Sequence, residues 1–376
     1  MAGGSVDMDV DDLDNSGLIA SNGGLTIAGK TIQGSGTFLS RGDTVLNATN
    51  GITLAAQTMT IGGQNMVNTN AGVTASGDVQ LAGGSGDLAL KGVKVNAGGS
   101  AQLTGTNVTL AAAKVDNSGQ QNATGTQVAS GGALTIKATD NVNVIGSSAK
   151  AGTTLDVAAD NGSVAVVSTD VARNNQSGYT RTLSTDQQQS QLSAGTNATI
   201  KAGDDILLSG SSVEAKGNVA LAAGDDINIT AAQEQSASTF GKKSASSITH
   251  VGSEISAGGD LSVKAGNGGG DHDLNIVGSK LAADGKVALK ADGDVTIAEA
   301  TDTATLDTRL SSKGGFLGTS EKTTTHLETT TAVGSAITGG GGVGIESGKD
   351  TVISASKIEA GSENGADLNI WMRIQC

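Results

Sequence analysis

The sequence predicts an all-β protein, a right-handed parallel β-helix from which polar β-hairpins project. Three observations support this fold class: a repeat of about 20 residues, a two-residue alternation of apolar side chains within each copy, and the absence of proline from a chain with 57 glycines. Repeats of this kind form coils of short strands, and each coil buries its apolar face only by stacking on its neighbours.

The repeat is clearest in the adjacent copies GTNATIKAGDDILLSGSSVEAK and GNVALAAGDDINITAA. Ile206 and Leu208 of the first copy recur as Ile227 and Ile229 of the second, each displaced by 21 residues. Side chains two residues apart in a strand point to the same side. These pairs are therefore expected to face the interior of a narrow rod.

Composition supports continuous strand pairing. Proline cannot donate to a strand ladder, so a ladder that runs the length of the chain excludes it. Gly, Asp and Asn between the apolar pairs supply the positive φ angles of turns. Only 1% of residues are aromatic, so the interior must be filled by aliphatic side chains in thin layers.

The repeat divides the chain into two regions and a tail. Residues 1–130 carry a looser form, and residues 131–370 carry a tighter form from Gly131 onward. Residues 371–376, WMRIQC, break the pattern and contain Trp371 and Cys376, the sole tryptophan and cysteine. We expect an irregular tail there, at a truncated or frame-shifted end.

Three polar insertions interrupt the tighter region, near 171–192, 233–254 and 301–336. All are rich in Ser, Thr and Gln, and the third has two alternating arms around KGGFLG. Alternation of Thr with other residues favours strands, so we expect hairpins that extend away from the rod. Low-complexity disorder is the alternative.

Charge and segment composition exclude several classes. The net charge of −14 argues against a nucleic-acid partner, which needs clustered Lys and Arg. No stretch approaches the length of a membrane span, and the start of the chain lacks signal-peptide regions. If the protein is exported, the signal lies outside this sequence.

The rungs and spaced insertions resemble the haemagglutinin repeats of two-partner-secretion exoproteins, of the filamentous haemagglutinin and contact-dependent growth inhibition type. The GSxI and AGxxhxhxA motifs (h apolar) of the second region carry much of this resemblance. It implies a fragment of a secreted or cell-surface bacterial adhesin stalk that attaches to other cells through a receptor, glycan or membrane. It also implies an outer-membrane transporter as partner of the full-length protein. The alternative within the family is a toxin-delivery stalk that engages the target-cell membrane.

The insertions also hold the candidate binding residues. Each contains one aromatic residue with basic residues nearby, a combination that suits an acidic or membrane surface. The candidates are Tyr179, Arg181, Phe240, Lys242, Lys243, Lys313 and Phe316. The alternative is that the aromatic residues only hold the hairpin tips together and make no contact with a partner.

Other motifs are weaker. Arg41, Gly42 and Asp43 spell a tripeptide that integrins bind, but Gly-Asp recurs throughout as a turn. The run GNGGGDHDL at 266–274 and the paired acids at 204–205 and 225–226 are interpreted as turns rather than metal sites. No catalytic grouping recurs, so we expect no enzyme, no cofactor and no metal; a β-helical polysaccharide lyase or hydrolase is the distant alternative.

Overall fold

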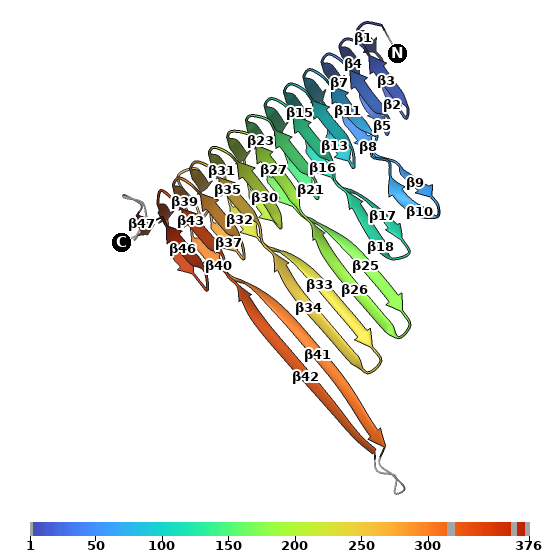
Figure 1. The fold of residues 1–376 in the computed structure, drawn as a ribbon. Helices are drawn as coiled ribbons and strands as arrows, with labels where there is room; N and C mark the ends of the chain where they lie inside the picture. The colour runs from blue at the N-terminus through green and yellow to red at the C-terminus, as the bar shows by residue number, and fades with distance from the viewer. Residues whose placement is uncertain (1–2, 314–319, 362–366, 373–376) are drawn as a thin grey trace.

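The chain is wound into a rod that carries a flat sheet along one side (Figure 1). The computed structural model describes residues 3–313, 320–361 and 367–372. Each turn of the rod, here called a rung, consists of three short strands, and equivalent strands of successive rungs pair in parallel. The right-handed parallel β-helix predicted from the sequence is confirmed.

Three parallel sheets form the faces of the rod. The first face contains β1 (Val6–Asp9), β4 (Leu25–Gly29), β7 (Thr44–Ala48), β12 (Val79–Ala82), β15 (Ala101–Gly105), β20 (Leu134–Ala138), β23 (Leu155–Ala159), β28 (Ala198–Ala202), β31 (Val219–Ala223), β36 (Leu261–Ala265), β39 (Val287–Ala291), β44 (Val343–Ser347) and β47 (Leu368–Met372). The second face contains β2 (Asp12–Asn15), β5 (Thr31–Gly34), β8 (Ile52–Ala55), β13 (Leu88–Lys91), β16 (Val108–Ala111), β21 (Val142–Ile145), β24 (Val164–Val167), β29 (Ile206–Ser209), β32 (Ile227–Thr230), β37 (Leu274–Val277), β40 (Val295–Ala298) and β45 (Thr351–Ile353). The third face contains β3 (Leu18–Ser21), β6 (Thr37–Ser40), β11 (Gly72–Ala75), β14 (Lys94–Ala97), β19 (Gln127–Ser130), β22 (Ser148–Ala151), β27 (Ser190–Ala194), β30 (Ser211–Ala215), β35 (Glu254–Ala257), β38 (Lys280–Ala283), β43 (Ala336–Gly339) and β46 (Lys357–Ala360).

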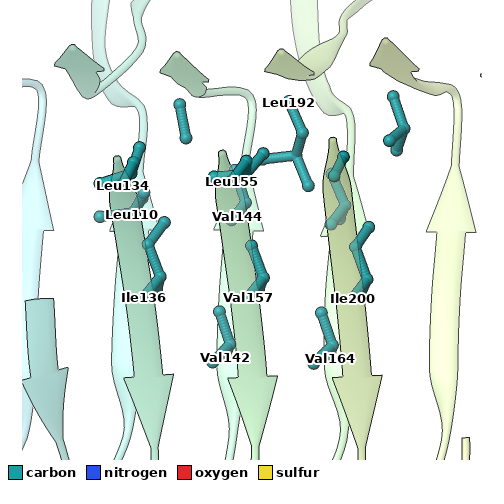
Figure 2. Close-up of a cluster of buried hydrophobic side chains, with 14 of the residues drawn as sticks. Leu110, Leu134, Ile136, Val142, Val144, Leu155, Val157, Val164, Leu192 and Ile200 are labelled. Carbon is teal, nitrogen blue, oxygen red and sulfur yellow. The ribbon is translucent and has the colours of Figure 1, made fainter. Parts of the chain in front are cut away.

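The interior of the rod is filled by the apolar pairs. Ile206 lies opposite Ile227 and Leu208 opposite Ile229, in the register that the 21-residue displacement predicts. All four side chains are almost fully buried. Figure 2 shows equivalent Leu, Ile and Val side chains of successive rungs stacked in columns between the faces. Burial of these columns stabilises the rod, because every added rung covers the apolar layer of the one before it.

Five β-hairpins leave the rod in the described residues. Their strands are β9 (Thr58–Ile61) with β10 (Gln64–Val67), β17 (Ala113–Asn117) with β18 (Gln120–Thr124), β25 (Thr169–Ser177) with β26 (Thr180–Gln188), β33 (Ala232–Phe240) with β34 (Lys243–Val251), and β41 (Ala300–Lys313) with β42 (Ser320–Val333). The last three are the predicted insertions. Sequence analysis missed the first two, which lie in residues 1–130.

The hairpins do not project separately. The last four pair edge to edge into one eight-stranded antiparallel sheet, in the order β17-β18-β25-β26-β33-β34-β41-β42, which we call the fin. The β9–β10 hairpin joins its margin through Asn65, whose backbone N–H donates to Asn117 Oδ1 at 2.6 Å. Strand length in the fin is five residues in the first hairpin, nine in the next two and 14 in the last, so the fin reaches farthest from the rod near the C-terminus (Figure 1).

Every hairpin leaves the same corner of the rod, between a second-face and a third-face strand, and only on alternate rungs. Strands in a sheet are spaced about 4.8 Å apart, whether they belong to neighbouring rungs or to one hairpin. Two rungs therefore span the width of one two-stranded hairpin. This match of spacings allows successive hairpins to meet and pair without gaps.

On the intervening rungs the same corner is a tight turn at a glycine with positive φ. Gly210 has φ 53° and Gly278 has φ 57°. A Cβ at Gly210 would lie 2.5 Å from Cβ of Ala232, and one at Gly278 would lie 2.7 Å from Cβ of Ala300. Ala232 and Ala300 begin the hairpins of the next rungs. These glycines thus both turn the chain and make room for the hairpin beside them.

A ladder of buried hydroxyl groups follows the glycine corner. The backbone N–H of Ser211 donates to Ser253 Oγ, that of Ser253 to Ser279 Oγ, and that of Ser279 to Ser335 Oγ, each at 3.2 Å. A separate run of such bonds begins at Thr126, whose backbone N–H donates to Ser147 Oγ. Between the two runs, the buried Ser211 Oγ has no hydrogen-bond partner. The serines of the GSEI and GSAI sequences, Ser253 and Ser335, therefore each accept a buried backbone N–H of the preceding rung at this corner, which would otherwise lack a partner.

The three faces run without a break through residues 130 and 131, where the sequence divides into looser and tighter repeats. Near the C-terminus, β47 includes Trp371 and Met372, whose backbones pair with Glu346 and Ser347. Regular pairing thus extends two residues into the segment predicted as an irregular tail. Residues 373–376 lie outside the described residues.

Candidate contact surface of the fin

The outer margin of the fin brings together candidate residues from separate insertions. Tyr179 lies in the two-residue turn between β25 and β26, and its side chain is 90% exposed. Phe240 ends β33, is 63% exposed, and lies opposite Thr180 of β26 on one side and Lys243 of β34 on the other. Two hairpin tips therefore place an aromatic side chain each at adjacent positions.

Basic side chains lie on the same margin. Lys242 occupies the turn after Phe240, and its Nζ contacts Ser311 Oγ of the neighbouring hairpin. Lys243 is exposed at the start of β34. Arg181 Nε donates to Asn174 Oδ1 at 3.4 Å. The candidate aromatic and basic groups of the first and second predicted hairpins thus lie along one exposed margin of the fin, which we call the tip row: Tyr179, Arg181, Phe240, Lys242 and Lys243.

Two candidates are placed only in part. Lys313 is the last residue of β41, and its backbone pairs with Ser320 of β42. It lies five residues beyond Thr308, which pairs with Lys243, the first residue of the neighbouring strand β34. Phe316 lies outside the described residues. The paired strands β41 and β42 therefore extend farther from the rod than those of the other hairpins (Figure 1).

Exposed leucines on the fin are functional candidates that the sequence analysis missed. Leu306 and Leu327 are cross-strand partners, and Leu306 also lies opposite Ala245. Leu306, Leu310 and Leu327 are 44%, 61% and 58% exposed. Because side chains alternate between the faces of a sheet, these leucines share one face with Phe240, here called the leucine face. The sequence contained a signal for this face, because Leu306 and Leu310 are four residues apart and residues at an even spacing in a strand point to the same side.

The reverse face of the fin is polar and charged. His326 Nδ1 lies 2.7 Å from Oδ1 of Asp307, its cross-strand partner, and His326 Nε2 lies 3.9 Å from Glu328 Oε2. The hydrogen bond and charge of Asp307, with a smaller contribution from Glu328, raise the pKa of His326. Nearer the rod, an open hollow on this face is lined by Leu183, Ala237 and Ile248 among polar residues. The two faces of the fin thus differ in chemistry.

The fin is also set apart by charge. Lys and Arg residues within its four hairpins are balanced by Asp and Glu residues, so the net charge of −14 belongs to the rest of the chain. Like-charge repulsion therefore opposes approach of an acidic surface to the rod but not to the fin.

The tripeptide Arg41–Asp43 lies far from the fin, at a corner of the third rung. Backbone N–H groups of Arg41 and Gly42 donate to Ser21 O and Gly23 O of the preceding rung. Asp43 Oδ1 accepts the backbone N–H of Asp78 at 2.8 Å. The tripeptide is thus part of the rod's corner structure, and an integrin role for it stays a prediction.

The acidic turn residues likewise accept backbone hydrogen bonds at the corners of the rod. Asp205 Oδ1 accepts the N–H of Asp226, whose own Oδ1 accepts that of Asp273. In the glycine run, Asp292 Oδ2 accepts N–H groups of Gly268 and Gly269. Burial raises the pKa of Asp292, but these N–H donors, with Lys264 and Lys290, outweigh burial and lower it. Within the described residues, no group of three His, Cys, Asp or Glu side chains is arranged to hold a metal ion.

In the part of the chain that the structure covers, no helix has the length and apolar character needed to cross a membrane.

Comparison with known proteins gives a family match over the fin-bearing part of the rod. The family model of the hemagglutinin repeat matches residues 114–178, 171–247 and 241–371. The 16S rRNA endonuclease CdiA of Enterobacter cloacae subsp. cloacae is 28% identical over 206 residues, which cover 46% of this chain and 6% of that protein. The tRNA nuclease CdiA-2 of Burkholderia pseudomallei is 28% identical over 312 residues, which cover 81% of this chain and 10% of that protein. No solved structure matches. The aligned region thus amounts to a tenth or less of either relative.

Proposed function

Because the chain belongs to the hemagglutinin repeat family, we propose that it is a rigid segment of the stalk of a secreted bacterial exoprotein, and that it attaches to other cells through the fin. Family membership confirms the resemblance predicted from the sequence, and the hemagglutinin repeat is a structural unit rather than a catalytic one. The observation that supports the attachment role most directly is the tip row, where exposed aromatic and basic side chains meet at the outer margin of the fin.

The rod suits a stalk. The twelve complete rungs of the described residues, at about 4.8 Å each, give a length of about 58 Å. Because each rung is hydrogen-bonded to the next on three faces, the rod resists bending. A longer array of such rungs would hold a distal domain far from the cell that secretes it.

The fin suits contact. Tyr179 and Phe240 make no contribution to the buried core, because both side chains point into solvent. Aromatic rings with nearby Lys residues fit a membrane interface or an acidic surface. The neutral charge balance of the fin allows such an approach where the acidic rod would be repelled.

Toxin delivery is the second candidate function, and one observation favours it. Both curated relatives carry the name CdiA and are named as nucleases, of 16S rRNA and of tRNA. In this proposal the chain is the stalk of a contact-dependent inhibition protein, exported with an outer-membrane transporter, and the fin engages the membrane of the target cell.

Substitutions at the tip row test the attachment role better than removal of a hairpin. Deletion of 236–247 would remove more than half of β33 and of β34, and it would leave β26 and β41 each unpaired along most of one edge. We therefore choose a variant with Tyr179→Ser, Phe240→Ser, Lys242→Ser and Lys243→Ser. Its matched control carries Leu18→Ser and Leu39→Ser, which remove exposed apolar side chains from the rod instead.

Attachment of labelled protein to bacterial cells is measured, together with binding to protein-free vesicles that contain or lack anionic lipid. We expect the tip variant to lose at least about tenfold in attachment, about 1.4 kcal/mol, while the control retains it and both melt as the parent does. Vesicle binding lost by the tip variant favours membrane engagement; attachment without vesicle binding favours a receptor or glycan. Unchanged attachment of the tip variant would contradict the proposal.

A further inference from the structure

The reverse face of the fin contains a hollow over its four central strands, β25, β26, β33 and β34. Its volume is about 640 Å³, within the range of about 300–1,000 Å³ that is usual for sites of small ligands. The residues that line it come from three different hairpins. The hollow therefore exists only when the hairpins are assembled into the fin.

Two rows of side chains cross this hollow, about 7 Å apart along the strands. Cross-strand pairing gives the first row as Asn174, Leu183, Ala237 and Ser246, and the second as Ala172, Thr185, Gln235 and Ile248. Each row mixes apolar side chains with uncharged polar ones. Leu183 is 40% exposed and forms an apolar floor with the alanines and the isoleucine, while amides and hydroxyls stand beside it.

Some of these polar groups are free to bind a ligand. Within the described residues, the hydroxyl of Thr185, the side-chain amide of Gln235 and Nδ2 of Asn174 have no hydrogen-bond partner in the protein. Thr185 and Gln235 are direct cross-strand partners, so two of the free groups lie side by side. Water occupies such exposed groups, and ligand hydroxyls that replace this water keep the hydrogen bonds.

The charges in the lining cancel. The charged residues that line the hollow are Asp116 and Arg173. Asp116 Oδ1 accepts the backbone N–H of Gly119 at 2.9 Å, and Arg173 Nε donates to Asp186 Oδ2 at 2.8 Å. Both charges are thus engaged within the protein. By charge complementarity, the hollow favours a neutral ligand over an acidic or a basic one.

The chemistry of the lining fits a saccharide. A sugar ring presents C–H groups on its faces and hydroxyl groups around its rim. Such a ring can lie on Leu183, Ala237 and Ile248 while its hydroxyls bond to the free groups of Thr185 and Gln235. Among the described residues that line the hollow, none is aromatic, so a nucleobase or another planar aromatic ligand finds no ring on which to stack.

The hollow is open toward the rod. A second hollow, of about 540 Å³, shares Thr185 and Gln235 with the first and continues to Leu207 and Ser209 on the second face of the rod. Its lining is also rich in uncharged polar groups, including Gln187. The two hollows together form a groove that runs along the hairpins, so there is room for a chain of several sugar rings.

We propose that this groove binds a neutral oligosaccharide of the target-cell surface, with Leu183, Ala237 and Ile248 beneath the sugar and Thr185 and Gln235 bonded to its hydroxyls. The proposal rests on the attachment role of the fin and names the chemical class of its partner. The tip row and the groove then contact the same cell from different parts of one sheet.

Binding to purified polysaccharide tests the ligand class. The probe is the neutral polysaccharide of the bacterial cells used in the attachment assay, freed of protein and lipid and separated from acidic polysaccharide by anion exchange. We expect saturable binding of the neutral fraction, at least about tenfold tighter than that of the acidic fraction. Periodate cleaves the vicinal diols of sugars, so treatment of the neutral fraction with periodate should abolish binding.

Two variants test the site itself. Thr185→Val combined with Gln235→Met removes the hydroxyl and the amide at nearly constant volume, whereas Ala237→Leu fills the floor and leaves the polar groups in place. The matched control is Thr182→Val with Ser238→Ala, a cross-strand pair of the same two strands on the leucine face. We expect each groove variant to lose at least about tenfold in affinity, while the control binds as the parent does and all variants melt as the parent does.

Absence of binding to the neutral fraction, unchanged affinity of either groove variant, or an equal loss in the control would overturn the proposal. The attachment assay separates this failure from failure of the tip row. If the tip variant loses attachment and the groove variants retain it, the tip row holds the cell and the groove proposal is wrong. If only the groove variants lose attachment, the fin attaches through its reverse face and the role of the tip row is wrong.

Discussion

The rod and the fin use the same strand spacing but are stabilised in different ways. In the rod, side chains of alternate residues are buried in columns, as Ile206 and Ile227 are. The fin is a single layer whose strands are largely exposed on both faces and rich in Thr and Ser. Apolar burial therefore dominates the rod, whereas backbone pairing and cross-strand contacts dominate the fin. Substitutions of one chemical kind should have different effects in the two regions.

The largest difference is expected for a charge introduced into each region. Ile227→Asp places an unpaired carboxylate in the rod interior and should lower the free energy of unfolding by several kcal/mol, on the order of 4. Leu306→Asp on the leucine face should cost less than about 1 kcal/mol. Urea unfolding followed by circular dichroism measures both. Equal losses would show that the fin also depends on a buried core.

Glycines with nearly the same φ provide a second comparison. Gly210 turns the rod corner at φ 53°, and Gly241 turns the β33–β34 hairpin at φ 56°. Alanine at either position is strained by about 1 kcal/mol. At Gly210 its Cβ would also meet Ala232, whereas nothing lies within 4 Å of a Cβ at Gly241.

We therefore expect Gly210→Ala to cost about 2 to 3 kcal/mol and Gly241→Ala about 1 kcal/mol, as measured by thermal melting of each variant. If Gly241→Ala is the more damaging of the two, close packing at the hairpin base does not determine the requirement for glycine.

Hydroxyl groups provide a third comparison. Ser253 Oγ accepts the backbone N–H of Ser211 inside the corner ladder and donates to Thr230 O at 2.8 Å. Ser246 Oγ bonds to Thr305 Oγ1 on the exposed fin. Ser253→Ala leaves a buried N–H without an acceptor and should cost about 1 to 2 kcal/mol. Ser246→Ala should change stability by less than about 0.5 kcal/mol, because water replaces the lost partner. Hydrogen exchange of the Ser211 amide should rise in the first variant and stay constant in the second.

The smallest effect is expected from pH. The pKa of His326 is raised above 6.5, chiefly by Asp307 and less by Glu328, and Arg309 of β41 is a nearby positive charge on the same face. A raised pKa means that this pair stabilises the hairpin fully below pH 6.5 and that the contribution disappears as pH rises through the folded-state pKa. Amide exchange in β41 and β42, corrected for its intrinsic pH dependence, should show modestly lower protection at high pH. His326→Gln should remove that dependence, and rod amides should not share it.

Local pattern was sufficient to predict the rod. The 21-residue displacement that relates Ile206 to Ile227 is the pairing register itself, because each rung is built from local alternation and turn residues. The three longer hairpins were also predictable, since their arms alternate over nine or more residues. The two shorter hairpins have arms of four or five residues. Their signal was the Gly62–Gly63 and Ser118–Gly119 pairs between alternating segments, which favour two-residue hairpin turns.

Assembly of the hairpins into the fin was not predictable from any one insertion. It depends on the number of rungs between hairpins, a property of the whole coil. The sequence predicted that the candidate residues lie on the insertions. The proximity of Tyr179 to Phe240, however, follows from the pairing of β26 with β33. The leucine face likewise depends on pairing between hairpins, because Leu306 comes to share a face with Phe240 only when β34 pairs with β41.

The alternation of hairpin and glycine corner also constrains how such a gene can lengthen or shorten. Duplication of one rung with a glycine corner would shift every later hairpin by a single strand width and leave a gap that no hairpin fills, and duplication of one rung with a hairpin would place two hairpins in overlapping positions. Duplication of two rungs, one with a hairpin and one with a glycine corner, would preserve the sheet. The heritable module of this architecture is therefore the pair of rungs, and recombination that respects it changes the reach of the stalk while keeping the fin unbroken.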